Sequence, residues 1–271
     1  MKHLSIDIET KSSIDIGKAG LYRYAQSKDF EILLFAYRYD RGDVQIIDLA
    51  LGENMPDVVL DDLKNPDVVK HAYNAAFEWY CLNRAVYTTP LEQWKCTMIH
   101  GLYCGYTAGL DATGKAIGLP QDKRKLTTGK ALIRYFCTPC KPTKNNGNRI
   151  WNLPKHAPEK WELFKEYCQQ DVVTESAILA RLNAFPVPEE EEKLWQMDVR
   201  MNAFGVKVDA DLIYGALQIN EMSENVLEYE AKEVTKLDNP NSAVQLLNWI
   251  HGKGVEMDNL QKATVAEKLS G

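Results

Sequence analysis

The stretch His3-Leu-Ser-Ile-Asp-Ile-Glu9 alternates polar and apolar side chains and predicts a β-strand near the start of the chain. Successive side chains of a strand point to opposite faces, so Asp7 and Glu9 are expected on the same face. Two carboxylates in this arrangement can bridge one metal ion and reach a second. The alternative interpretation is a pair of solvated acids on an exposed strand face.

The rest of the chain combines strand patterns with later helical patterns. Residues 31–39 and 44–49 are predicted to be two strands joined around Arg41-Gly42, and residues 68–73 form a further apolar run. Apolar residues at helical spacing predict a long helix over 159–183. The predicted fold class is therefore α/β, with a mixed sheet flanked by helices.

A second motif, Asn74-Ala-Ala-Phe77-Glu78, lies where the run of residues 68–73 meets a predicted helix. Asn74 is expected to cap this helix and to reach a substrate, whereas Phe77 can pack inward or against a base. Glu78 is expected in the first helical turn. The helix dipole favours an acid there even without a catalytic role, so this motif alone leaves both interpretations open.

The third motif is Tyr167-Cys-Gln-Gln-Asp171, whose first and last residues are expected on one face of the long helix. A carboxylate there can bind a metal ion, while the phenol contacts an attacking water. A free tyrosine has a pKa of about 10, so Tyr167 is expected to orient the water by hydrogen bonding. The alternative is a half-buried tyrosine beside a surface acid, and Glu166 and Glu175 are interpreted as such surface acids.

The three motifs in this order resemble those of the DnaQ-like (DEDDy) 3′–5′ proofreading exonucleases, which have a ribonuclease H-like fold. The resemblance spans residues 1 to about 186 and differs at Glu78, where that family usually has aspartate. It implies two divalent metal ions per site, Mg²⁺ with Mn²⁺ as a substitute, which suit oxygen ligands. It implies that the catalytic residues are Asp7, Glu9, Glu78, Tyr167 and Asp171. Of these, it implies all except Tyr167 as metal ligands.

The implied reaction is the release of 5′-nucleotides from the 3′ end of single-stranded DNA. Thr10 and Asn74 match positions that contact the terminal nucleotide in that family. A basic cluster, Lys123-Arg-Lys125 with Lys130 and Arg134, is expected to follow the phosphate backbone of the incoming strand. The candidate substrate-binding residues are Thr10, Asn74, Phe77, Lys130 and Arg134.

A proline-rich break, Phe185-Pro-Val-Pro188, followed by four glutamates, predicts a domain boundary between residues 1–186 and 187–271. The later segments Gly205-Val-Lys-Val-Asp209 and Asn241-Ser-Ala-Val-Gln245-Leu resemble the start of the polymerase region in family A (polymerase I-like) DNA polymerases, most closely the phage and prophage members. The resemblance implies a helical, thumb-like second part. The palm and fingers domains would be missing partners, and the chain a fragment of a polymerase or a split gene product.

Composition limits the classes of protein to which the chain can belong. The net charge is −6, with the acidic excess after residue 186, which argues against a nonspecific coating protein but leaves nucleic acid possible. No run of about eighteen apolar residues and no leader pattern occur, so no membrane span is expected and a cytoplasmic location is predicted. Two alternatives stay open: an RNA-trimming exonuclease of the same fold, similar to ribonuclease D or oligoribonuclease, and a catalytically weak exonuclease-like domain that binds DNA or acts as a scaffold.

Overall fold

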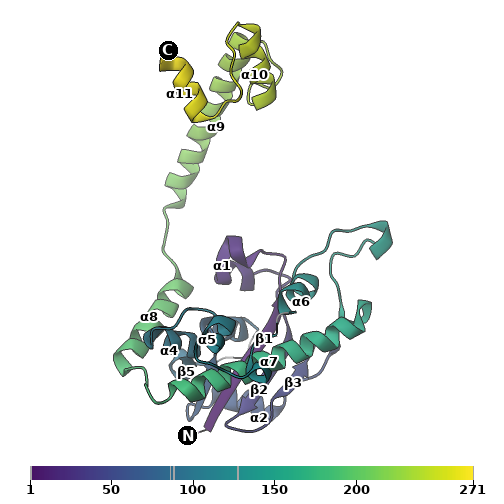
Figure 1. Ribbon diagram of the computed structural model, residues 1–271, viewed down its shortest axis with the longest axis vertical. Coiled ribbons are helices and arrows are strands. Elements are labelled where there is room, and N and C mark those ends of the chain that lie inside the picture. Colours follow the sequence, from purple (N-terminus) through teal and green to yellow (C-terminus); the bar gives the residue numbers. More distant parts are fainter. Residues whose placement is uncertain (1, 86, 88, 127, 271) are drawn as a thin grey trace. The chain divides into compact units, whose positions relative to one another are not determined.

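The computed structural model describes residues 2–85, 87, 89–126 and 128–270, and a five-stranded mixed sheet forms the centre of its first part. The strands lie in the order β3-β2-β1-β4-β5 (Figure 1). β1 pairs antiparallel with β2, whereas β4 continues the sheet in parallel with β1 and β5. The strand bounds are β1 (Lys2–Lys11), β2 (Glu31–Tyr39), β3 (Gln45–Asp48), β4 (Val68–Ala72) and β5 (Trp94–Cys96).

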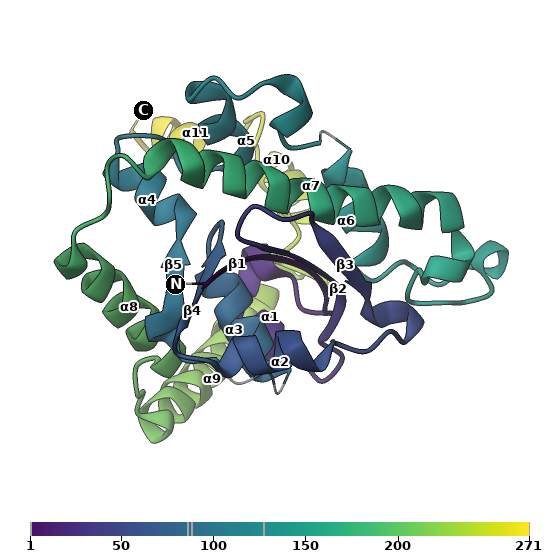
Figure 2. The same cartoon turned by 90° about the horizontal axis from the view of Figure 1, so that it is seen from below.

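Helices cover both faces of this sheet (Figure 2). On one face, the apolar side of β1 packs with α1 (Ile16–Ala25), α2 (Asp57–Lys64) and α3 (Ala76–Arg84). On the other face, α7 (Pro158–Leu182) lies along β1 and β2. Three further helices, α4 (Thr97–Tyr103), α5 (Leu110–Ala116) and α6 (Gly129–Phe136), each contact α7.

Between α6 and α7, where every residue is described, the chain forms a long segment whose only regular elements are short 3₁₀ turns. Short 3₁₀ turns occur there and elsewhere in the described chain: η1 (Leu49–Leu51), η2 (Leu91–Gln93), η3 (Gln121–Lys123), η4 (Lys144–Asn146) and η5 (Pro154–His156). The fold class predicted from sequence, a mixed sheet between layers of helices, is confirmed.

The chain divides into two compact units after Gly205, later than the predicted boundary at residue 186. The difference arises because α8 (Glu189–Phe204) belongs to the first unit. Its Trp195 and Val199 are buried in the same apolar cluster as β1, and the Tyr22 hydroxyl donates to the carbonyl of Val199. The glutamate run therefore begins a helix of the first unit and does not mark the start of the second.

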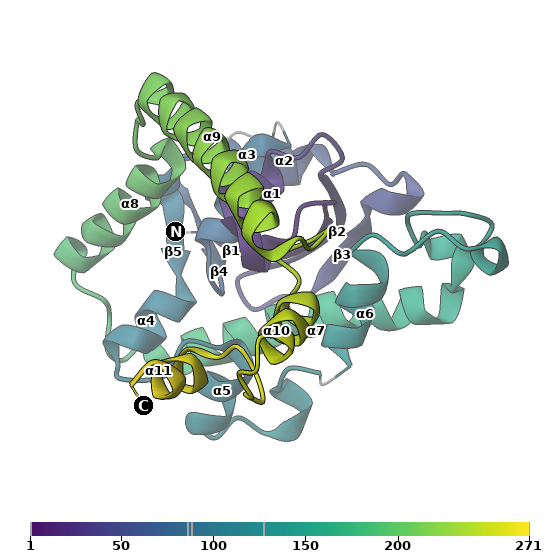
Figure 3. The same ribbon diagram turned by 90° about the horizontal axis from the view of Figure 1, so that it is seen from above.

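The second unit contains α9 (Ala210–Thr235), α10 (Ala243–Gly252) and α11 (Lys262–Ser270) (Figure 3). Two of these helices begin with a side-chain cap: Asp209 accepts a hydrogen bond from the amide of Leu212 in α9, and Ser242 accepts one from the amide of Gln245 in α10. Among the helices of the described residues, none has the length and apolar content needed to cross a membrane.

Candidate active site

All five residues predicted to be catalytic line one cavity of about 250 Å³ in the first unit. Of the predicted substrate-binding residues, Thr10, Asn74 and Phe77 line it as well. The cavity thus collects side chains from β1, the β4–α3 junction and α7, which are distant in the sequence. Its other lining residues are Ile8, Ile16, Tyr24, Tyr73, Lys125, Ile133 and Cys137.

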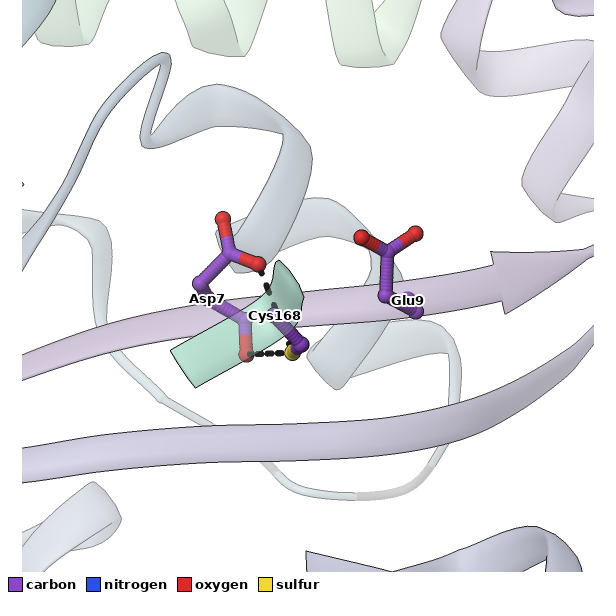
Figure 4. A group of neighbouring side chains, drawn as sticks. All are labelled: Asp7, Glu9 and Cys168. Atoms are coloured by element: carbon purple, nitrogen blue, oxygen red, sulfur yellow. Dashed lines mark hydrogen bonds between the residues drawn. The ribbon is translucent and has the colours of Figure 1, made fainter. Parts of the chain in front are cut away.

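Asp7 and Glu9 project from the same side of β1, as the alternation predicted (Figure 4). They are not solvated acids on an open strand, because α7 covers this face and Glu9 is buried. The Cys168 thiol of α7 lies 3.5 Å from Asp7 Oδ2, to which it donates. One ligand atom from each of Asp7, Glu9 and Cys168 lies within 4.8 Å of the others.

The carboxylates of this cluster raise one another's pKa values. Burial raises the pKa of Asp7 well above its ordinary value, and the charge of Asp171 adds to the effect. Burial likewise raises the pKa of Glu9 and of Glu78, with Asp7 as the next contributor to each. A buried group of like charges is costly without positive charge nearby, and perturbed carboxylates in a cleft are typical of functional sites.

Part of the required positive charge comes from Lys125, whose Nζ lies 2.5 Å from Asp171 Oδ2. Burial raises the pKa of Asp171, and the ion pair with Lys125 opposes that shift. Burial, the largest single cause, lowers the pKa of Lys125, but the charge and hydrogen bond of Asp171 together with the charges of Asp7 and Glu9 outweigh it, so that pKa is raised. Two buried oxygens, Glu78 Oε2 and Asp171 Oδ1, have no hydrogen-bond partner in the described chain.

Glu78 lies in the first turn of α3, as predicted, but Asn74 does not cap this helix. The cap position is Ala75, which makes no side-chain cap bond, so that prediction is wrong. Asn74 instead has a φ of 72°, in the left-handed region that asparagine tolerates better than most residues. The carbonyl of Asn74 accepts a hydrogen bond from the amide of Phe77 at 2.9 Å. This tight turn holds Asn74 at the wall of the cavity.

Tyr167 is fully packed except for the part that meets the cavity. Its ring stacks on Phe164 with a centroid distance of 6.2 Å and an interplanar angle of 8°, and Lys125 Nζ lies 4.8 Å from the ring centroid. Burial and the neighbouring Asp171 raise the pKa of Tyr167, so its hydroxyl stays protonated at neutral pH. Gly129, at the start of α6, lies so close to the ring that a Cβ on this residue would overlap it.

The two basic residues predicted to bind substrate, Lys130 and Arg134, do not line the cavity. Lys130 and Arg134 are exposed on α6, whereas their neighbour Ile133 faces the cavity. From the same basic cluster it is Lys125 that reaches the carboxylates. The interpretation of Glu175 as a surface acid is also wrong: Glu175 is buried and accepts hydrogen bonds from the Thr97 and Ser176 hydroxyls.

Several residues that line the cavity or contact its lining had no sequence signal. Tyr24 belongs to α1, and its hydroxyl pairs with Thr10 Oγ1 at 2.8 Å, a contact that only the tertiary fold creates. Cys168 lies within the third motif, but nothing in the motif assigns it a role. Gly129 belongs to none of the three motifs.

Comparison with known proteins finds a phage DNA polymerase that is similar in sequence to this chain. No protein-family model matches the chain. A DNA polymerase of Bacillus phage SP02 is 49% identical over 270 residues, which cover 99% of this chain and 41% of the polymerase. The chain therefore spans less than half the length of that relative.

Among solved structures, Trypanosoma brucei ribonuclease D superposes with a TM-score of 0.50 at 18% sequence identity, covering 77% of this chain and 68% of the ribonuclease. At this identity the likeness concerns the fold alone. The chain is thus similar over its length to part of a phage DNA polymerase, and its ribonuclease H-like fold is shared with ribonuclease D.

Proposed function

We propose that the chain is a divalent-metal-dependent 3′–5′ exonuclease that releases 5′-nucleotides from DNA ends, as the proofreading part of a DNA polymerase. The observation that carries this proposal is the single cavity lined by Asp7, Glu9, Glu78, Asp171 and Tyr167. The homology to a phage DNA polymerase and the exonuclease fold both support a nuclease.

The residues of the cavity fit a divalent metal. Glu78 Oε2 and Asp171 Oδ1 are buried without hydrogen-bond partners, which is costly unless a cation or water satisfies them. Asp7, Glu9, Glu78 and Asp171 would hold the metal, and an all-oxygen carboxylate set suits Mg²⁺, with Mn²⁺ as a substitute. Such an ion supplies charge neutralisation at the phosphodiester and makes water a better nucleophile at neutral pH.

The chain's own side chains have separate tasks in this proposal. The protonated Tyr167 hydroxyl orients the attacking water by hydrogen bonding, because its raised pKa prevents it from acting as a base. Phe77 offers a half-buried ring against which the terminal base can pack. Asn74 and Thr10 present polar atoms to the sugar and phosphate of the same nucleotide.

The size of the cavity supports cleavage at a strand end. A volume of about 250 Å³ is below the roughly 300–1,000 Å³ of pockets that enclose drug-sized ligands. The proposed occupant of this small cavity is the terminal nucleotide of a frayed, single-stranded 3′ end.

The second unit is proposed to begin the polymerase region. Within its own unit, α9 leaves large apolar side chains uncovered along its length, including Leu212, Leu217, Met222 and Val226. Exposed apolar surface of this kind usually meets a partner. The SP02 polymerase extends well beyond the matched residues, and a corresponding palm and fingers region is the proposed partner of this surface.

The test compares wild type with Asp7→Ala on a 5′-labelled single-stranded DNA in the presence of Mg²⁺. Asp7→Ala should reduce stepwise shortening from the 3′ end by more than about 100-fold, because outer residues of metal sites alone commonly account for 10–100-fold. Glu166→Ala, at an exposed acid on α7, is the matched control and should digest like wild type.

Three outcomes discriminate the candidate functions. Equal digestion by wild type and Asp7→Ala would remove the catalytic assignment. Binding of DNA without any digestion would favour the scaffold alternative. Faster shortening of an RNA of the same sequence would favour RNA trimming.

A further inference from the structure

Lys125 lies on the segment between η3 and α6 and reaches into the cavity. Its Nζ is 2.5 Å from Asp171 Oδ2 and 4.8 Å from the centroid of the Tyr167 ring. The side chain keeps 29% of its surface exposed, whereas that of Asp171 keeps 5%. The lysine is therefore the accessible member of an otherwise buried ion pair.

The cavity contains more negative than positive charge, which makes the ion pair of Lys125 and Asp171 important. Among the lining residues that the structure describes, four are carboxylates and Lys125 alone is basic. One ammonium cannot neutralise four carboxylates, and Glu78 Oε2 remains without any partner. The lysine is thus the single internal cation of a site whose ligand set suits divalent cations.

We propose that Lys125 is an exchangeable counter-ion of the metal centre. Its ammonium holds Asp171 when no metal is bound, and it must release that carboxylate when a divalent cation binds. This inference rests on the proposed function only in taking the same carboxylates as metal ligands. The exchange makes metal binding weaker than the four carboxylates alone would allow.

The chemistry of lysine suits this role. An ammonium on a flexible four-carbon stem can swing away from a carboxylate without moving the backbone. The Tyr167 ring provides a second, weaker resting contact on the cavity wall. The phosphate of an incoming strand offers a further partner once the carboxylate has been released.

If the ion pair had only a structural role, removing Lys125 would change the metal affinity in the opposite direction to that expected from competition. If Lys125 only anchored its loop, removing it would loosen the site, and metal binding would weaken or stay unchanged. If Lys125 competes with metal, removing its charge should tighten metal binding even as the metal-free protein becomes less stable. The sign of the affinity change therefore separates the two roles.

The experiment is a Mn²⁺ titration, by calorimetry or by the electron paramagnetic resonance of free Mn²⁺, on the full chain without nucleic acid. Lys125→Met should bind Mn²⁺ about tenfold more tightly than wild type, a difference of roughly 1.4 kcal/mol. Lys125→Arg keeps the charge and should remain within about twofold of wild type. The matched control is Lys123→Met, which removes the same charge from an exposed neighbouring lysine and should also stay within about twofold.

Thermal unfolding in EDTA gives an independent readout. Lys125→Met should melt below wild type without metal, and the difference should shrink at saturating Mn²⁺, because a ligand stabilises the folded state according to its affinity. If circular dichroism shows that the methionine variant is unfolded, Lys125→Gln makes the same comparison.

Unchanged or weaker Mn²⁺ binding by the neutral variants would overturn the counter-ion role, while leaving the proposed nuclease in place. Tighter binding by Lys123→Met to the same extent would also overturn it, by showing a general charge effect. If neither wild type nor the neutral variants bind Mn²⁺, the metal centre itself is wrong. If wild type binds Mn²⁺ as expected but does not digest DNA, the proposed function is wrong and the counter-ion role stands.

Discussion

Replacing Gly129 by alanine should displace the Tyr167 ring without touching any carboxylate. A methyl group built on Gly129 would lie 2.7 Å from Tyr167 Cδ2, and closer still to Cε2 and Cζ. Normal carbon contacts begin at about 3.4–3.5 Å, so the ring and α6 must separate by roughly an ångström. The φ of Gly129 is not in the left-handed region, so alanine fits the backbone, and the whole cost comes from the ring.

The magnitude follows from how firmly the ring is held. Tyr167 is 2% exposed and stacks on Phe164, so it cannot swing freely into solvent. Overpacking of this kind costs about 1–3 kcal/mol. For a domain of about 200 residues, a cost of 2 kcal/mol corresponds to a fall of roughly 4–8 °C in Tm. A displacement of about 1 Å at a catalytic group can reduce the rate on the order of 100-fold.

The assay combines thermal unfolding with digestion of 3′ ends. Gly101→Ala is the matched control, because Gly101 is a buried helical glycine whose new methyl would meet Thr113 Cγ2 at an ordinary 3.6 Å. It should keep its activity and gain up to about 1 kcal/mol of stability, as alanine does over glycine in a helix. In a Tyr167→Ala background, Gly129→Ala should cost no further stability, because the obstructing ring is gone.

The reasoning is refuted if Gly129→Ala melts and digests like Gly101→Ala. It is equally refuted if the destabilisation persists when the Tyr167 ring has been removed. Either result would mean that the close approach of α6 to Tyr167 does not determine the position of the phenol.

Two further predictions concern single side chains. Tyr167→Phe keeps the ring packing and removes the hydroxyl, so Tm should stay within about 1–2 °C while the digestion rate falls about 10–100-fold; an unchanged rate in a single-turnover assay would exclude the hydroxyl from catalysis. Burial lowers the pKa of His71 to about 3, with His3 the next contributor. The unfolded chain binds this proton near pH 6.5 and the folded chain does not, so stability is full above that pH and declines as the pH falls towards 3. Between pH 6.5 and 4.5, wild type should lose about 2–3 kcal/mol more than His71→Gln in urea unfolding; equal losses would assign the pH dependence to other groups.

Much of the fold was predictable because its signals are local. The alternation around Asp7 predicted β1, and the turn at Arg41-Gly42 predicted the β2–β3 hairpin. The start of α3 near Glu78 and the extent of α7 were predicted to within about two residues. The spacing of the three motifs also identified the four carboxylates and Tyr167, which the fold brings to one cavity.

The remainder depends on tertiary contacts that no local pattern encodes. Nothing in the sequence distinguishes Lys125 from Lys130, since the choice depends on the path of the segment before α6. The sequence pattern predicts Glu175 as a surface acid, whereas in the fold it is enclosed by the sheet and Thr97. The boundary at residue 186 followed from composition, whereas the actual division depends on Trp195 packing into the first unit.

The cavity draws all of its lining from residues 7 to 171, and the second compact unit begins only at Val206. The two units can therefore be altered independently by mutation. In a polymerase that carries this unit, one nucleotide change that converts Asp7 to asparagine would leave the apolar core intact while removing a carboxylate. Under the proposed function, a polymerase with this change would still extend DNA but would leave misincorporated bases in place, and its error frequency would rise.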